Sequence, residues 1–208
     1  MYRRPLIGEL QDCCTSAKLT RSHPLPKEEG ASVRGGAEDM PNDMSKVTNI
    51  VIAGLGGEGV LKASDIVAEV AFRAGLDVKK SEIHGMSQRG GSVTSDVRFG
   101  EKVYSPMVPP GEADYLVVLS PDQVEPNRWR LREGGTLVTP DAVAVSELRA
   151  KRSLNVALLG CLSMSLPFPE EAWLEAIRQN LAEKLHAANF HAFAVGRAAA
   201  KEPGSGAL

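Results

Sequence analysis

The spacing of hydrophobic and polar positions changes along the chain, and the changes predict alternating strands and helices. A short, mainly apolar run at 47–53 is typical of a buried strand. Apolar residues then recur at helical spacing over 60–74, and Gly75 follows at the position that ends many helices. A second strand is predicted at 77–83. This order of strand, helix and strand indicates an α/β fold.

The rest of the chain continues the alternation. Residues 92–99 alternate between apolar and polar, and Gly100 with Glu101 suits a two-residue turn into a short return strand at 102–104. Further strands are predicted at 113–119 and 136–139, and helices at 155–166, 169–185 and 189–199. Together these elements predict a three-layer Rossmann-like α/β domain, with a mostly parallel sheet and an antiparallel hairpin at about 92–104.

Domain boundaries follow the same pattern. Residues 1–45 have few periodic apolar positions and several prolines, so they are predicted to be a disordered N-terminal extension. Residues 46–200 form the predicted domain, and 201–208 a flexible tail. Met44, or alternatively Met40, is the expected natural start.

Composition narrows the classes of function. The formal net charge of -2 gives no electrostatic reason to expect nucleic acid or an anionic membrane as partner. No apolar run approaches the ~20 residues of a membrane span, and the N-terminus lacks a secretory apolar core, so a cytoplasmic location is predicted. The chain has three cysteines. A [4Fe-4S] cluster needs four thiolates, so any such cluster must lie on another chain.

The most distinctive stretch connects the strands at 77–83 and 92–99. It combines an imidazole, a hydroxyl, an amide and a guanidinium with glycines, and the candidate catalytic residues are His84, Ser87, Gln88 and Arg89. Gly90 and Gly91 would let the backbone approach another surface closely. The alternative is a loop whose polar groups satisfy only each other and water.

A second glycine-rich loop follows the first strand. Gly54, Gly56 and Gly59 match the G-x-G-x-x-G pattern of dinucleotide sites. With Gly57, Glu58, Gly90 and Gly91 they are the candidate cofactor-binding residues. A dinucleotide site also needs an acid at the carboxyl end of the second strand. Asp77 lies at the wrong end of that strand, and Glu82 lies late, beside His84. Glu58 would add a negative charge next to a bound pyrophosphate. An NAD(P) enzyme that acts alone is therefore the less favoured interpretation, and close packing at Gly59 is the structural alternative.

The motifs taken together resemble a known family. They are Gly54 to Val60, His84 to Val93, Val97 to Gly100, Tyr104 to Pro106, Asn155 with Leu159 and Gly160, and Asn189 with Ala192, Phe193 and Gly196. In this order they are similar to the gamma-type domain of 2-oxoacid:ferredoxin oxidoreductases, most of all to the small (beta) subunits of its indolepyruvate branch. The resemblance covers about 47–198. One departure is Glu58, where the family usually has glutamine.

This resemblance implies an enzyme of several subunits. Thiamine diphosphate, Mg²⁺ and the [4Fe-4S] clusters would lie on a large (alpha) subunit, and this chain alone would bind no cofactor. The reaction would be oxidative decarboxylation of an aryl 2-oxoacid such as indolepyruvate, with coenzyme A as co-substrate and ferredoxin as electron acceptor. The loop from His84 to Gly91 would lie against the large subunit near its thiamine site. Its alternative role is subunit docking without a part in the chemistry, and a purely non-catalytic assembly subunit remains a further alternative.

Overall fold

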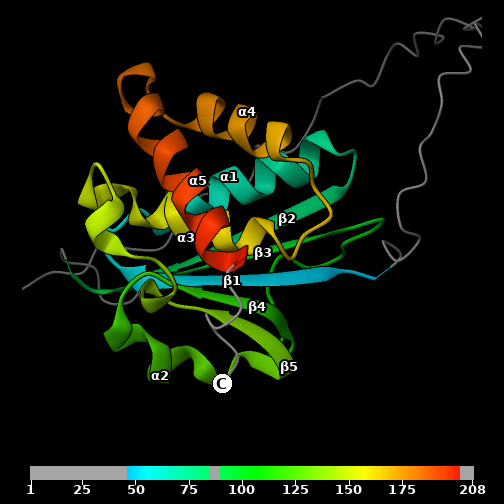
Figure 1. Ribbon diagram of the computed structural model, residues 1–208. Coiled ribbons are helices and arrows are strands. Elements are labelled where there is room, and N and C mark those ends of the chain that lie inside the picture. Colours follow the sequence, from blue (N-terminus) through cyan, green and yellow to red (C-terminus); the bar gives the residue numbers. More distant parts are fainter. Residues whose placement is uncertain (1–45, 85–89, 202–208) are drawn as a thin grey trace, which may run out of the picture. The chain divides into compact units, whose positions relative to one another are not determined.

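The computed structural model describes residues 46–84 and 90–201, and a five-stranded sheet runs through this part of the chain (Figure 1). Its strands are β1 (Thr48–Leu55), β2 (Asp77–His84), β3 (Ser92–Gly100), β4 (Ala113–Val118) and β5 (Leu131–Val138). The α-helices are α1 (Val60–Arg73), α2 (Val124–Arg128), α3 (Leu154–Ser163), α4 (Glu170–Asn180) and α5 (His186–Lys201). The predicted α/β class is confirmed.

The sheet has the order β2-β3-β1-β4-β5. β4 pairs parallel with β1 and with β5, whereas β3 pairs antiparallel with β1 and with β2. Four strands therefore share one direction and β3 is reversed. The sheet is mostly parallel by strand direction, but two of its four neighbouring pairs are antiparallel, so this prediction is confirmed only in part.

The antiparallel hairpin consists of β2 and β3. Its register runs without interruption from Asp77 opposite Gly100 to His84 opposite Val93. The predicted hairpin over 92–104 was therefore wrong in its partner strand. Both edges of β3 are already occupied, by β1 and β2, so no edge remains for a return strand at 102–104. The loop that begins at His84 is thus the hairpin connection.

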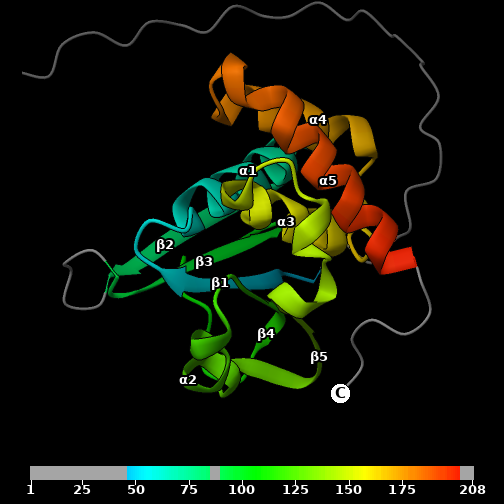
Figure 2. The ribbon, with the colours of Figure 1, turned by 60° about the vertical axis from the view of Figure 1, so that its left-hand side comes forward.

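Helices α1, α3, α4 and α5 cover one face of the sheet, and α2 lies on the other (Figures 1 and 2). Alternation along β1 serves both faces: Ile50 and Ile52 belong to the core under the four helices, while Val51 packs in a smaller cluster with Val108 and Leu116. The three predicted layers are present. The second helical layer is thin, because the connection 101–112 supplies part of it.

Two element boundaries differ from the prediction. β5 begins at Leu131, five residues earlier than predicted, and Gly134 and Gly135 lie inside it beside a register shift against β4. A Cβ at Gly135 would lie 3.0 Å from the Ala113 carbonyl oxygen, so this glycine allows a close approach of two strands and does not mark a turn. The helix predicted to reach residue 185 ends at Asn180, whose side-chain amide donates to the Ala176 carbonyl at 2.9 Å.

A buried ion pair holds the connection 101–112 against the sheet. Asp96 on β3 is fully buried, and the Arg130 guanidinium donates to both of its carboxylate oxygens at 2.7 Å. The Val108 amide donates to the same carboxylate at 2.9 Å. This arrangement satisfies a charge that burial would otherwise make costly.

Across the ranges 46–84 and 90–201, no helix is both long and apolar enough to cross a membrane.

Candidate functional site

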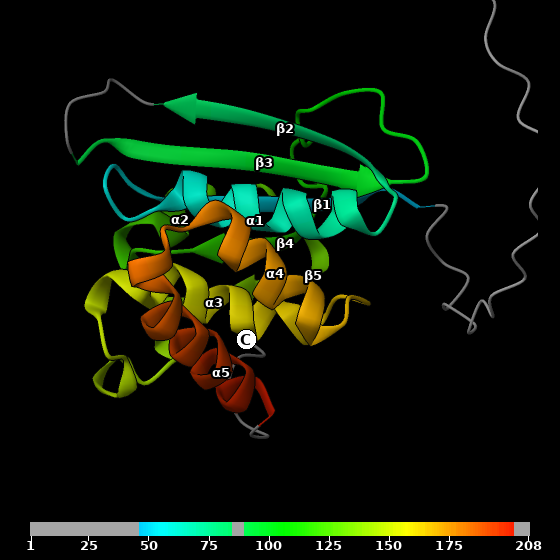
Figure 3. The same cartoon turned by 90° about the horizontal axis from the view of Figure 1, so that it is seen from above.

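The carboxyl ends of β1 and β4 meet the end of the β2–β3 hairpin at one edge of the sheet (Figure 3). Leu55 at the end of β1 lies opposite Ser92 at the start of β3, and Ala53 lies opposite Val118 at the end of β4. From β1 the chain passes through α1 to β2, which lies at one end of the strand order, whereas β4 pairs with β1 on its opposite edge. Open α/β sheets bind ligands at this kind of switch point.

Two glycine segments join at this edge, and we call residues 54–59 and 90–92 the glycine edge. The Gly56 amide donates to the Gly91 carbonyl at 2.9 Å, and a Cβ at Gly56 would lie 3.4 Å from the Gly90 nitrogen. Gly57, Gly59 and Gly90 adopt positive φ, which favours glycine. The structure therefore brings together glycines that the sequence presents about 35 residues apart.

Glu58 closes the turn of the first glycine segment. Its carboxylate accepts the Leu55 amide at 2.7 Å, and its own amide donates to the Leu55 carbonyl at 3.1 Å. A Cβ at Gly54 would lie 2.8 Å from that carboxylate oxygen, so glycine at 54 gives Glu58 room to fold back. The negative charge is thus directed to the backbone of its own loop. Ligand binding by Glu58 stays a prediction.

Asn155 connects the same loop to helix α3. Its side chain is buried, and its amide donates to the Gly59 carbonyl at 3.2 Å. A Cβ at Gly59 would overlap this amide, so Gly59 allows close packing of the loop against a side chain of α3, whereas the sequence analysis expected close packing between strand and helix. The sequence analysis placed Asn155 in the family resemblance without giving it a role. A buried polar residue at the start of an apolar helix is the signal that could have found it.

A side-chain pair fixes the other end of the glycine edge. The Ser92 hydroxyl donates to the Gln123 side-chain oxygen at 2.7 Å, across 31 positions of the sequence. Gln123 ends the 3-10 turn Pro121–Gln123 that follows β4. Gln123 was missed, although a polar residue directly after a strand that ends at the ligand-binding edge is a usable signal.

The predicted catalytic residues are only partly within the described ranges. His84 is the last residue of β2, and its backbone pairs with Val93. Its side chain lies outside the description, as do Ser87, Gln88 and Arg89. The structure therefore shows that the predicted catalytic segment starts at the end of β2 and leads into the glycine edge at Gly90. The catalytic roles of its residues stay predictions.

The sheet order disfavours a dinucleotide site. In the dinucleotide fold the acid that binds the ribose ends the strand next to β1, but here β3 lies between β1 and β2. The acids on β2 are also paired: Asp77 contacts Lys79 at 2.9 Å, and Glu82 contacts Lys80 at 2.7 Å. Both are therefore poorly placed to hold a ribose beside Gly54 to Gly59.

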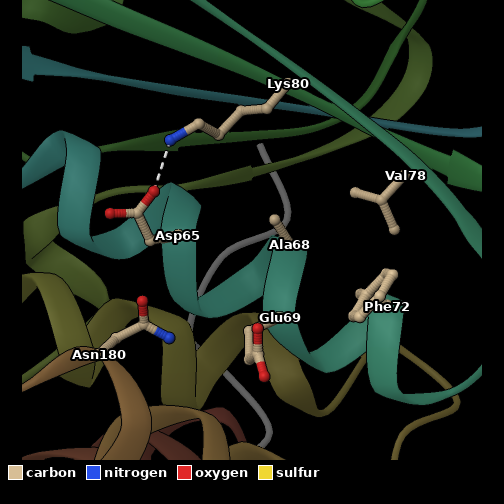
Figure 4. A pocket seen from close by; sticks show the side chains of 7 residues that line it. All are labelled: Asp65, Ala68, Glu69, Phe72, Val78, Lys80 and Asn180. Carbon is tan, nitrogen blue, oxygen red and sulfur yellow. Dashed lines mark hydrogen bonds and ion pairs between the residues drawn. The ribbon is translucent and has the colours of Figure 1, made fainter.

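A separate groove of about 350 Å³ lies along α1 and β2 (Figure 4). It is lined by Asp65, Ala68, Glu69, Phe72, Val78, Lys80 and Asn180. The Lys80 ammonium reaches Asp65 at 2.5 Å as well as Glu82. Burial lowers the Lys80 pKa, but the hydrogen bonds to these carboxylates outweigh burial, and the pKa is raised overall. The sequence analysis did not predict this groove.

The described residues offer no metal centre. No group of three or more histidine, cysteine, aspartate or glutamate side chains gathers within them. Cys161 is buried on α3, and its thiol donates to the Gly196 carbonyl at 3.2 Å. Burial raises its pKa to about 11, so this cysteine is a structural thiol, as predicted.

Comparisons with known proteins identify the family of this chain. A family model described as pyruvate ferredoxin/flavodoxin oxidoreductase matches residues 49–144. Indolepyruvate oxidoreductase subunit IorB from Thermococcus kodakarensis is 37% identical, covering 76% of this chain and 98% of that protein. The subunit of the same name from Pyrococcus horikoshii is 36% identical with the same coverage.

Two solved structures share the fold. The 2-oxoglutarate:ferredoxin oxidoreductase from Magnetococcus marinus, with 2-oxoglutarate, coenzyme A and succinyl-CoA bound, has a TM-score of 0.66 and 24% identity, covering 75% of this chain and 31% of that one. The gamma subunit of a keto/oxoacid ferredoxin oxidoreductase from Geobacter sulfurreducens has a TM-score of 0.63 and 23% identity, covering 74% and 98%. Because these two IorB subunits are 37% and 36% identical to this chain and are covered over 98% of their length, the chain belongs to the indolepyruvate oxidoreductase small subunits of the 2-oxoacid:ferredoxin oxidoreductase family.

Proposed function

We propose that this chain is the subunit without thiamine and without clusters in an enzyme that oxidatively decarboxylates an aryl 2-oxoacid to its acyl-CoA and reduces ferredoxin. Its partner would be a large subunit that binds thiamine diphosphate, Mg²⁺ and [4Fe-4S] clusters. The names of the relatives support indolepyruvate as the type of substrate. Coenzyme A in the Magnetococcus structure supports the acyl acceptor.

The observation that carries the proposal is the junction of the two glycine segments. Family membership gives the reaction class, and the bond between Gly56 and Gly91 holds the base of the His84 loop at the sheet edge where ligands of α/β folds bind. Ser92 with Gln123 anchors the same base from the side of β4. Residues 90–92, held in this way, would offer a fixed surface to a second subunit.

This chain would orient groups and exclude water, while the cofactors supply the chemistry. Bound thiamine diphosphate supplies the decarboxylation chemistry, and the clusters transfer electrons to ferredoxin. We propose that Arg89 pairs with a carboxylate or a coenzyme A phosphate, because its planar fork suits both. His84 would donate a hydrogen bond to the substrate or transfer a proton near neutral pH. Gly90 and Gly91 allow the close backbone approach that keeps water out.

The cytoplasm is the proposed location, where ferredoxin and coenzyme A would be available to the complex. An enzyme that uses NAD(P) without a partner is the weaker candidate, because β3 separates the glycine loop from the acids of β2. A purely assembly role is the other candidate, and it makes a different prediction for the loop residues.

Reconstitution of the complex with His84→Ala or Arg89→Ala separates these roles. We expect both variants to assemble with the large subunit and to lose at least about tenfold in 2-oxoacid-dependent ferredoxin reduction. The matched control is Lys46→Ala, an exposed residue before β1, which should behave as wild type. Full turnover with both variants would favour the assembly role, and loss of complex formation would favour docking. Turnover by this chain without a partner would refute the proposal.

A further inference from the structure

The two edges of the sheet differ in how well they could accept another strand. β5 at one edge contains Gly134 and Gly135 and a register shift, which are features that discourage pairing. β2 at the other edge is eight residues long, has no proline, and pairs with β3 in unbroken register. β2 is therefore the edge that is built to continue the sheet.

Lysines often protect an exposed edge by repelling a second strand. On β2 this protection is cancelled within the chain. Lys79 contacts Asp77 at 2.9 Å, and Lys80 contacts Asp65 at 2.5 Å and Glu82 at 2.7 Å. Along β2 two acidic residues, Asp77 and Glu82, flank two lysines, Lys79 and Lys80, so the formal charges of the strand cancel.

We propose that β2 pairs with β2 of a second copy of this chain, antiparallel, about a two-fold axis through Ser81. Such an axis stands perpendicular to the sheet and keeps the same face of both copies on the same side. Residues then oppose each other when their numbers add to 162, so Lys80 faces Glu82 of the copy and Glu82 faces its Lys80.

Charge and the length of paired strand together select this register. An axis at Val78 would also oppose unlike charges, Asp77 and Lys79, but it would pair only residues 77–79 of β2, whereas the axis at Ser81 pairs residues 78–84. An axis at Lys79, Lys80 or Glu82 would place identical charges directly opposite each other, which destabilises an antiparallel pair. The axis at Ser81 gives two Lys–Glu pairs on the α1 face and a Ser–Ser pair on the other face. Lys80 can serve all its neighbours, because an ammonium group has three donors for Asp65, its own Glu82 and the Glu82 of the copy.

The pairing would also affect the groove in Figure 4. Val78 and Lys80 line the groove and point to the α1 side of β2. Side chains on the same face of the second β2 would border the groove and close its open side. In this register residue 78 of one copy lies opposite residue 84 of the other, which brings the start of one hairpin next to the loop end of its neighbour.

Cysteine cross-linking of the full chain, alone and in complex with its large subunit, tests the proposal. Ser81→Cys in a Cys13→Ser and Cys14→Ser background would place two thiols opposite each other with Cα atoms about 5 Å apart, within disulfide range. Lys79→Cys is the control, because its two thiols would be about 14 Å apart along the strands. We expect a cross-linked pair for Ser81→Cys and none for Lys79→Cys. No cross-link at Ser81, as when a strand of the large subunit covers β2, or equal cross-linking at both positions, would overturn the proposal.

A charge variant tests the register independently. Glu82→Lys would face Lys80 of the copy, and we expect the dimer dissociation constant in sedimentation experiments to rise at least tenfold. Glu101→Lys makes the same charge change at another exposed position and should leave that constant unchanged. An unchanged constant for Glu82→Lys, or an equal rise for Glu101→Lys, would contradict pairing at Ser81.

Discussion

Single side chains shape the glycine edge by bonding to the backbone. Glu58 closes its own turn through the Leu55 amide, and Asn155 holds the Gly59 carbonyl. The glycines at 54 and 59 make room for these two side chains. The conformation of the loop therefore depends on side chains that need not touch a ligand.

Replacing Glu58 tests this role. Glu58→Ala removes the acceptor for the Leu55 amide, and we expect the free energy of unfolding to fall by about 1.5–3 kcal/mol, the usual range for a hydrogen bond to a charged group. Glu58→Gln keeps an acceptor oxygen at the same position and should lose less than half as much. Urea denaturation monitored by circular dichroism measures both variants. Equal stability of wild type and Glu58→Ala would show that the bond does not support the fold.

The hydrogen bonds of the Asp77 carboxylate should make the stability of the protein depend on pH. The Val103 amide, followed by Lys79, lowers the pKa of its carboxyl group in the folded state. The ionised form therefore stabilises the fold above the unfolded pKa, and this contribution is lost as the pH falls through the folded pKa. Asp77→Asn should lower the Tm at pH 7, and its difference from wild type should shrink as the pH falls below the ordinary aspartate pKa and through the lowered pKa of the folded state. A difference that stays constant as the pH falls would exclude titration of Asp77 as the cause.

At the scale of elements, two helices pack through glycines. A Cβ at Gly196 on α5 would overlap the Ala157 carbonyl on α3, and a Cβ at Gly160 would overlap the Phe193 carbonyl. The backbones of α3 and α5 thus lie close enough that any side chain at these two positions would separate them.

Gly196→Ala should destabilise the protein by about 3 kcal/mol, because overpacking at this crossing outweighs the gain in helix propensity. Ala194→Gly, on the exposed side of the same helix, is the control and should cost about 1 kcal/mol through propensity alone. Thermal unfolding of both variants measures the difference. If Gly196→Ala stabilises the protein, the close crossing is absent.

The accuracy of the sequence analysis also differs between elements. The spacing of apolar residues and the flanking glycines predicted β1, α1 and α3 well, because burial on a regular face is a local property of the sequence. The partner of β3 is decided by strands far away in the sequence, so the local turn signal at Gly100 and Glu101 indicated the wrong hairpin. Gly134 and Gly135 precede the predicted strand 136–139 as turn residues would, but they lie inside β5. A close approach of two strands at Gly135 leaves the same local signal as a turn.

For the candidate site, local sequence motifs indicated the two glycine segments, but they did not predict that the segments are in contact. The bond between Gly56 and Gly91 and the pair of Ser92 with Gln123 join segments that only the sheet order brings together. Gln123 belongs to the site because β4 ends beside β1, a pairing that the sequence around Gln123 does not reveal. Family motifs supplied the reaction class, which the spacing of residues could not.

At the scale of the whole molecule, the proposed function needs two subunits: a large subunit that binds the cofactors, and this chain, which orients groups and excludes water. The chain belongs to a family of oxidoreductase subunits, and its glycine edge is the proposed contact with the large subunit. A surface that meets another subunit loses access to water when the complex forms.

Hydrogen exchange tests this claim most directly. Amide exchange should be measured for peptides covering 54–59 and 84–93, in the free chain and in the complex with the large subunit. We predict that exchange in both peptides slows at least tenfold on assembly, while peptides from α4 keep their rates. Unchanged exchange across 54–59 and 84–93 in an active complex would show that the glycine edge faces solvent and would contradict the account.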